Sequence, residues 1–243
     1  MRSKLIIISF LICPVAIFSQ SAVDSALYNS SISAAIAVYH HETYEQASIF
    51  KGPQYLRYPF PIKEGHPYFL SDNPVTGSLT YEDIVYDSVP LLYDEISDQL
   101  VTTDFHHANL LQLYKQNVAR FNIAAHEFIR LEADSIAGHM VGAGFYEVLF
   151  VGKSAVYKKE IKTINKKAEN IEGLTRIIES ETHYYIFRKQ KYDEVGSLKS
   201  LLAVFSEHRK ELSRYLGVNK RRFRRHKENV IIRAAVFNEK LSN

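Results

Sequence analysis

The densest group of charged side chains lies near the C-terminus, where six basic residues surround a phenylalanine. They are Lys220, Arg221, Arg222, Arg224, Arg225 and Lys227, with Phe223 among them. Guanidinium and ammonium groups bind phosphates and carboxylates, and nucleic-acid binders add aromatic rings that stack on bases. The run lies between two segments of helical periodicity, so Phe223 is interpreted as an anchor to the core. The six cations are candidates for an anionic partner, and specific nucleic-acid recognition is not expected.

A second group has the residue types of a zinc site: Asp104, His106 and His107. Imidazole and carboxylate groups bind zinc. Neighbouring residues of a strand point to opposite faces, so both histidines reach one ion only where the segment turns. Polar turn histidines are the simpler interpretation. We therefore predict no metal and no cofactor, and retain these three residues as candidate ligands.

Signatures of common enzyme classes are missing from the sequence. It has no Gly-x-Ser-x-Gly elbow, Walker loop, dinucleotide-binding glycine motif or His-Glu-x-x-His motif. The carboxylates of Asp87, Asp94 and Glu95 are interpreted as turn and strand-end groups, because carboxylate pairs catalyse only at set separations. The sequence favours a non-enzymatic protein that binds or scaffolds a partner. An envelope enzyme with a His/Asp site, and a carrier of an apolar ligand inside a curved sheet, stay open as alternatives.

Residues 1–19 have the order of a secretory signal peptide. Arg2 and Lys4 precede an apolar stretch from Leu5 to Phe18, and Ser19 offers a cleavage site before Gln20. The stretch is shorter than the roughly 20 residues that a spanning helix needs. We therefore expect an exported, periplasmic or extracellular protein with no transmembrane segment after signal removal. The only cysteine, Cys13, lies within the signal, so no disulfide holds the mature chain.

Charge is distributed unequally between the two halves of the chain. Residues 20–150 contain 6 Lys and Arg against 16 Asp and Glu, whereas residues 151–243 contain 22 against 11. A basic surface of this kind suits an unknown protein or an anionic envelope component. The favoured alternative is that the two halves fold against each other, with residues 220–227 neutralising the acidic half.

The elements needed to position these residues follow from periodicity and turn signals. Residues 20–52 are predicted to be helical, and the proline-rich residues 53–76 to form an irregular connection that wraps a sheet. Short aromatic and β-branched runs then predict an antiparallel meander. The predicted strands are 77–81, 89–93, 99–103, 109–114, 118–123, 127–131, 145–151, 155–161, 184–187 and 191–195. The polar residues 163–182 are interpreted as a long mobile loop or short helix.

The last part of the chain has helical periodicity. Leu201, Leu202 and Phe205 are expected to face the core from an amphipathic helix over residues 198–216 that ends at Gly217. A second helix is predicted over about residues 227–241. We therefore predict an α+β protein: a curved antiparallel β-meander of about eight to ten strands, an N-terminal helix and a C-terminal helical hairpin. Its parts are a signal peptide (1–19), a helical segment (20–52), the sheet region (53–195) and the hairpin (196–243), the last two packed as one domain.

Six segments between residues 50 and 149 also carry a resemblance. They are Phe50-Lys51-Gly52-Pro53-Gln54-Tyr55, Gly65-His66-Pro67-Tyr68-Phe69, Gly77-Ser78-Leu79-Thr80-Tyr81, Val89-Pro90-Leu91-Leu92-Tyr93-Asp94, Phe121 to Phe128 and Gly144-Phe145-Tyr146-Glu147-Val148-Leu149. With the final Tyr-Tyr strand and two helices, they resemble a family of exported proteins common in Bacteroidota. That family has no assigned activity, so the resemblance implies layout and export only. The chain departs from it at His106 and His107.

Overall fold

The computed structural model describes residues 46–133, 141–169 and 173–241. From Ser48 onward they belong to one compact unit. The expected signal peptide and most of the expected N-terminal helical segment lie outside the described residues. Within that segment, the structure shows the short 3₁₀ helix η2 (Ser48–Phe50). The fold begins with the sheet that follows.

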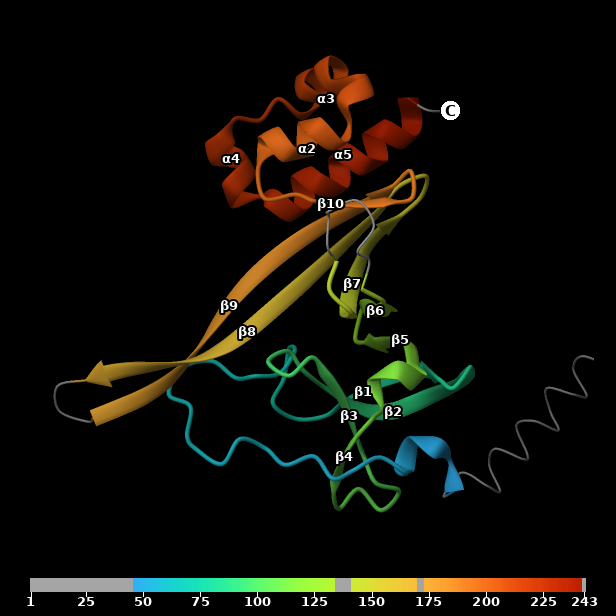
Figure 1. Cartoon of the computed structure of the whole chain (residues 1–243), viewed down its shortest axis with the longest axis vertical. Coiled ribbons are helices and arrows are strands. Elements are labelled where there is room, and N and C mark those ends of the chain that lie inside the picture. The colour runs from blue at the N-terminus through green and yellow to red at the C-terminus, as the bar shows by residue number, and fades with distance from the viewer. Residues whose placement is uncertain (1–45, 134–140, 170–172, 242–243) are drawn as a thin grey trace, which may run out of the picture. The chain divides into compact units, whose positions relative to one another are not determined.

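The predicted α+β class is confirmed, with an open ten-stranded antiparallel sheet and helices at its C-terminal end (Figure 1). The strands are β1 (Val75–Tyr81), β2 (Ile84–Asp94), β3 (Gln99–Thr103), β4 (Leu110–Gln112), β5 (Val118–Ile123), β6 (His126–Leu131), β7 (Gly144–Val151), β8 (Ala155–Glu169), β9 (Gly173–Arg188) and β10 (Lys191–Glu194). Their order is β10-β9-β8-β7-β6-β5-β1-β2-β3-β4. Two meanders therefore meet where β1 pairs with β5, and the short 3₁₀ helix η3 (Lys115–Asn117) precedes β5.

One predicted loop is wrong. Residues 163–169 and 173–182 belong to the long strands β8 and β9, which pair from Ala155 with Phe187 to Glu169 with Gly173. The segment is rich in polar residues and its few isoleucines are irregularly spaced, so it lacks the alternation that signals a half-buried strand. Its strand structure comes from pairing, and from the parallel bridge between Glu64 and Ile177 on β9.

The C-terminal part has more helices than the predicted hairpin. It contains α2 (Leu198–Val204), η5 (Ser206–His208), α3 (Arg209–Leu216), α4 (Lys220–Arg225) and α5 (Lys227–Leu241). The predicted helix 198–216 breaks at Phe205, whose φ of −103° and ψ of 44° are not helical. Gly217 ends α3 as predicted, and its backbone is left-handed. α5 is confirmed at its predicted residues.

The helices share a hydrophobic core with the sheet. Val156 of β8 and Ile186 of β9 are buried in the same cluster as Leu201, Phe205 and the apolar side chains of α3 to α5. Leu201 and Phe205 have no exposed surface, and Leu202 is partly buried at the edge of the cluster. The prediction that these side chains face the core is therefore correct for Leu201 and Phe205, and only partly correct for Leu202.

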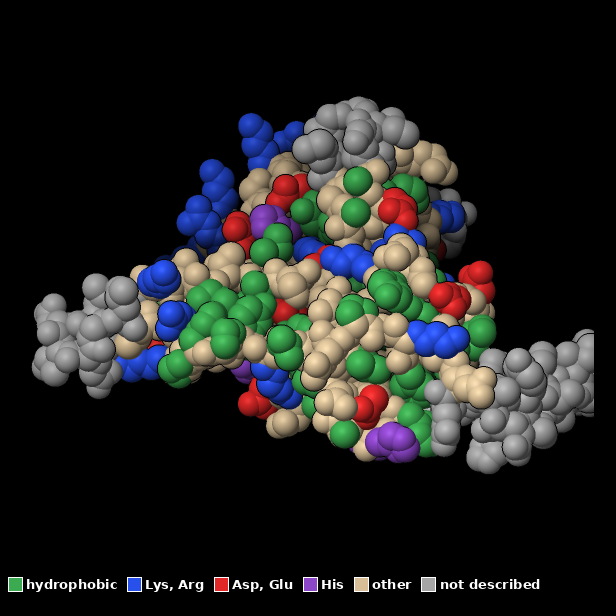
Figure 2. Space-filling model, turned by 60° about the horizontal axis from the view of Figure 1, so that its bottom comes forward, with side chains coloured by type: hydrophobic (Ala, Val, Ile, Leu, Met, Phe, Trp, Pro, Cys, Tyr) green, Lys and Arg blue, Asp and Glu red, His purple; other side chains and the backbone are tan. Residues whose placement is uncertain are grey.

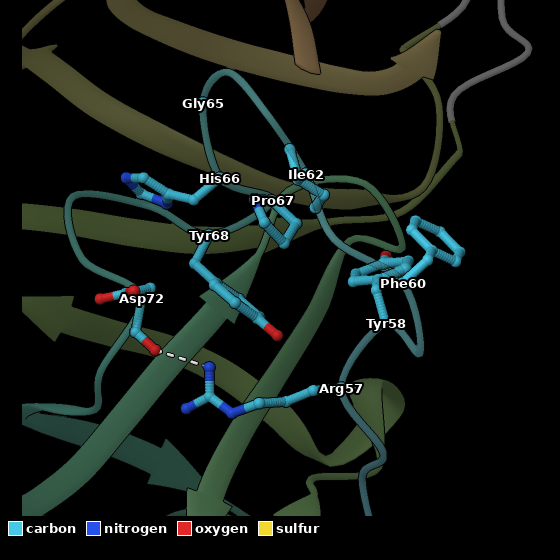
Figure 3. A pocket seen from close by; sticks show the side chains of 9 residues that line it. All are labelled: Arg57, Tyr58, Phe60, Ile62, Gly65, His66, Pro67, Tyr68 and Asp72. Atoms are coloured by element: carbon cyan, nitrogen blue, oxygen red, sulfur yellow. Dashed lines mark hydrogen bonds between the residues drawn. The ribbon is translucent and has the colours of Figure 1, made fainter. Parts of the chain in front are cut away.

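Residues 53–72, here called the strap, cross the sheet as an irregular segment. Backbone hydrogen bonds join Tyr55 to Leu110 of β4, Lys63 to Arg176 of β9 and Phe69 to Tyr93 of β2. These bonds hold the strap at three separate strands. Between them the strap lines a cavity that is open to solvent (Figure 3).

Among the described helices, none combines the length and apolar character needed to cross a bilayer.

Candidate anion-binding surface

The basic run forms a helix where a connection was predicted. Asn219 begins α4 as an N-cap, since its side-chain oxygen accepts a hydrogen bond from the Arg222 N–H at 2.9 Å. Phe223 is 1% exposed and packs in the core cluster of the helices. The cap and this single anchor position α4, and the interpretation of Phe223 as an anchor agrees with its burial.

The cations of α4 point away from that core. Lys220, Arg221, Arg222, Arg224 and Arg225 are exposed. Figure 2 shows Lys and Arg side chains standing clear of the surface on one side of the helical part. Lys227, the first residue of α5, differs because it is half-buried and its Nζ lies 5.7 Å from the centre of the Tyr184 ring. The basic face of α4 is defined by the five exposed residues.

No ion pair within the described part of the chain involves the basic face of α4. The described residues therefore show no ion pair that supports the expected neutralisation of the acidic half by residues 220–227. Arginine presents a planar fork of donors that matches carboxylate and phosphate oxygens. The face is chemically suited to anions outside the chain.

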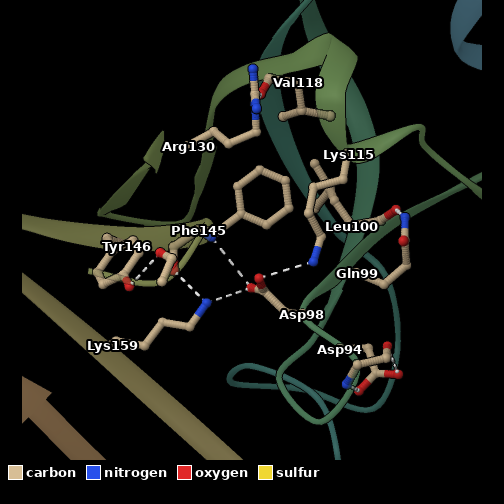
Figure 4. A network of polar contacts seen from close by, with 12 residues as sticks. Asp94, Asp98, Gln99, Leu100, Lys115, Val118, Arg130, Phe145, Tyr146 and Lys159 are labelled. Atoms are coloured by element: carbon tan, nitrogen blue, oxygen red, sulfur yellow. Dashed lines mark hydrogen bonds and ion pairs between the residues drawn. The ribbon is translucent and has the colours of Figure 1, made fainter. Parts of the chain in front are cut away.

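Three lysines of β8 make the contacts that were expected of the basic run. Lys159 Nζ lies 2.7 Å from Asp98 Oδ1 and donates to the Phe145 carbonyl at 2.9 Å (Figure 4). Lys115 and the Tyr93 hydroxyl also contact the Asp98 carboxylate, at 3.0 and 2.7 Å. Burial lowers the pKa of Lys159, and Asp98 opposes that shift.

The other two lysines pair with buried glutamates. Lys162 Nζ lies 2.9 Å from Glu95, and Lys158 Nζ lies 2.8 Å from Glu147. Burial raises the pKa of Glu95, whereas Lys162 works to lower it. His126 Nδ1 contacts the other oxygen of Glu147 at 2.6 Å. The two halves of the chain therefore do neutralise each other in part, through β8.

The candidate metal ligands lie in a turn after β3. Asp104 accepts hydrogen bonds from the Ala108 N–H and the Asn109 side chain, at 2.8 and 2.7 Å. His107 has a φ of 56°, and its Nδ1 lies 2.8 Å from the Thr103 hydroxyl. His106 instead contacts the Phe105 ring. The described residues hold no group of three metal-binding side chains, so the structure does not bring these candidates together as a ligand set.

Sequence reasoning missed the buried ion pairs and the cavity that the strap lines. Lys158 and Lys162 are not among the candidate residues of the sequence analysis, and their side chains are 17% and 11% exposed. Alternation alone does not show that another segment covers a polar face. The excess of acids in the first half was the one available signal.

Comparisons with protein-family models, with curated proteins and with solved structures find no match.

Proposed function

We propose that this chain is an exported, non-enzymatic envelope protein that binds a surface bearing closely spaced phosphate or carboxylate groups. The observation that carries the proposal is the basic face of α4, whose five cations are exposed and outside every ion pair of the described chain. Each Lys or Arg close to an anionic membrane surface contributes about 1 kcal/mol. Five such residues on one short helix are sufficient for salt-sensitive association.

The composition of α4 favours a charged surface over a protein interface with an apolar centre. Phe223, the one apolar residue of α4, is turned into the core. Stable protein interfaces have an apolar core that is depleted of charge. Lipid headgroups and anionic polymers need no such core, because counter-charge alone attracts them.

The first experiment measures binding of the mature protein to two probes. These are vesicles of phosphatidylglycerol with phosphatidylcholine, studied by cosedimentation, and immobilised dextran sulfate, studied by elution with salt. We expect binding at low salt that falls steeply as the Debye length shrinks below about 10 Å. Replacing Arg221, Arg222, Arg224 and Arg225 with Gln should weaken binding by about tenfold or more.

A matched control removes the same charge elsewhere, with Lys51, Arg120, Lys166 and Lys199 replaced by Gln. It should bind nearly as well as wild type. Vesicle binding alone would identify a lipid surface, and dextran sulfate binding alone a polymer. Equal losses in the two quadruple variants, or no binding of wild type to either probe at low salt, would refute the proposal.

Export is tested separately. The order of charged, apolar and small residues in 1–19 and the resemblance to exported proteins support it. N-terminal sequencing of the protein recovered from the cell envelope or the medium should begin at Gln20 or within a few residues. Recovery of the full-length chain from the cytoplasm only would contradict this part of the proposal.

A further inference from the structure

The strap lines a cavity that is open to solvent and separate from the basic face of α4. Its volume is about 240 Å³, and the side chains that matter for ligand chemistry are Arg57, Tyr58, Phe60, His66, Tyr68 and Asp72. All come from the strap itself, which the sheet holds by backbone hydrogen bonds at Tyr55, Lys63 and Phe69. A wall held in this way loses little conformational freedom on binding.

Arg57 is fixed across the face of Tyr68. Its guanidinium carbon lies 5.3 Å from the ring centre, and its Nη1 donates to the Asp72 carbonyl at 2.7 Å (Figure 3). Within the described chain, Arg57 forms no ion pair. The rest of its donor fork is therefore available for oxygens of a ligand.

Acceptors and aromatic surface lie beside these donors. Asp72 Oδ1 accepts a hydrogen bond from Asn73 at 3.1 Å, and its side chain lines the cavity. Phe60 and Tyr58 are half-buried, and their ring centres are 5.9 Å apart. The Arg176 guanidinium carbon lies 4.3 Å from the centre of the Phe60 ring and covers one face of it. The cavity thus combines a guanidinium, a carboxylate and half-buried aromatic rings.

His66 adds a polar group without a second charge. Burial lowers the pKa of its imidazole, and the nearby Lys162 lowers it further, so the ring is neutral at neutral pH. Its buried Nδ1 has no hydrogen-bond partner. An unsatisfied buried nitrogen of this kind costs free energy, and a bound water or small rearrangement on ligand binding would recover it.

A second cavity adjoins the first at Tyr58. Its volume is about 330 Å³, and it is lined by Gln54, Gln99 and Gln112 among others. Gln99 and Gln112 use their amide N–H groups on backbone carbonyls, which leaves their side-chain oxygens as acceptors.

Asp94 also lines the second cavity, but its carboxylate is already engaged. It accepts from the hydroxyls of Tyr55, Tyr58 and Ser97 and from two backbone N–H groups. Asp94 therefore holds Tyr58 in place between the two cavities, and the glutamines supply the polar contacts of the second.

We infer that the two cavities bind a neutral oligosaccharide, with one sugar unit on each side of Tyr58. A sugar ring offers C–H faces to aromatic side chains and hydroxyls that both donate and accept, which suits a lining of donors, acceptors and rings. An apolar ligand would desolvate Arg57 and Asp72 without replacing their hydrogen bonds. A phosphate group would meet Arg57 but also the Asp72 carboxylate. Each cavity is at or below the low end of the roughly 300–1,000 Å³ typical of drug-sized ligands, so each takes one small unit.

Isothermal titration calorimetry with hexasaccharides of glucose in α-1,4 and β-1,4 linkage, of xylose, of mannose and of N-acetylglucosamine tests the inference. At least one should bind the mature protein. Phe60→Ala removes a ring face and Arg57→Gln removes the charged donor fork, and each should weaken binding by about tenfold or more, equivalent to about 1.4 kcal/mol.

Tyr114→Ala is the matched control, because Tyr114 is 45% exposed and lines neither cavity. It should bind as wild type does, and urea melts should show that all three variants fold. Absence of heat with every hexasaccharide, or affinities unchanged in both cavity variants, would overturn the inference. The quadruple Arg→Gln variant of α4 should retain saccharide binding, so failure of the anionic-surface proposal and failure of this one are distinguishable.

Discussion

The lysines of β8 and the basic face of α4 carry the same charge but occupy opposite environments. Lys159 and Lys162 are each 11% exposed and pair with Asp98 and Glu95 of the acidic half. The cations of α4 are exposed, and no described acid pairs with them. The lysines of β8, which lie beside acidic residues of the first half, are thus buried. The basic residues of α4 are exposed to solvent. The net charge of each half of the chain does not tell which of its basic residues are buried in ion pairs and which are exposed.

The two regions should also differ in energetics. Breaking a buried pair leaves an uncompensated charge in a poorly solvated site and costs about 3–5 kcal/mol. An exposed charge contributes about 0–1 kcal/mol. The lysines of β8 are therefore expected to matter for folding, and the arginines of α4 for association.

Phe223→Ala should have the largest effect on stability. The side chain is 1% exposed, and removal of a buried Phe costs about 3–5 kcal/mol through lost transfer energy and the cavity left behind. Urea unfolding followed by circular dichroism measures the loss. The exposed Tyr114→Ala serves as control and should change stability little. A small loss at Phe223 would show that α4 is held by contacts other than its one apolar side chain.

Lys159→Met should cost about 3 kcal/mol, near the lower end for a buried pair because Asp98 keeps Lys115 as a partner. Lys166→Met, at an exposed position of the same strand, is the control. Adding Asp98→Asn to Lys159→Met should recover part of the loss, since the uncompensated carboxylate is then removed. Equal urea midpoints for Lys159→Met and Lys166→Met would contradict the contrast between the regions.

The quadruple replacement of Arg221, Arg222, Arg224 and Arg225 by Gln should change the free energy of unfolding by less than about 1 kcal/mol, because exposed charges contribute little. Urea melts on the protein used for vesicle binding measure this directly. A loss of several kcal/mol would mean that the α4 cations stabilise the fold, and would restore the expectation that they neutralise the acidic half.

The smallest effect is expected at Glu207, which pairs with Arg188 and Lys189. Hydrogen bonds from Lys189 and Arg188 lower its pKa from 4.5 to about 2. Because the pKa is lower in the folded state, the stabilisation is present above pH 4.5 and is lost as the pH falls towards 2. At neutral pH the urea midpoint of the wild type should be slightly higher than that of Glu207→Gln. The difference between the two midpoints should shrink at about pH 3. A difference that grows on acidification would contradict the assignment.

The sequence by itself determined the class of the fold and much of the sheet. β3 and β5 have the predicted residue bounds, and α5 lies where its apolar spacing placed it. β5 and α5 are predictable because one face is mainly buried and the other is not, which leaves a period in the sequence. β3 is buried on both faces and was recognised instead as a short β-branched run between turn residues. Gly217 was a reliable helix end because few other residues adopt its φ of 55° readily.

Only the tertiary structure decided the β8–β9 ribbon, the break at Phe205 and the partners of the cations. Residues 163–169 and 173–182 have no regular apolar alternation that would reveal strands, and the pairing of β8 with β9 supplies their order. Phe205 leaves the helix in a fully buried position, although its spacing alone continues the helical stripe. Lys162 is covered because the strap lies over it, with the His66 and Tyr68 carbonyls accepting from its ammonium group at 3.2 and 2.6 Å. Burial of a charge depends on segments about a hundred residues away, and local periodicity carries no information about them.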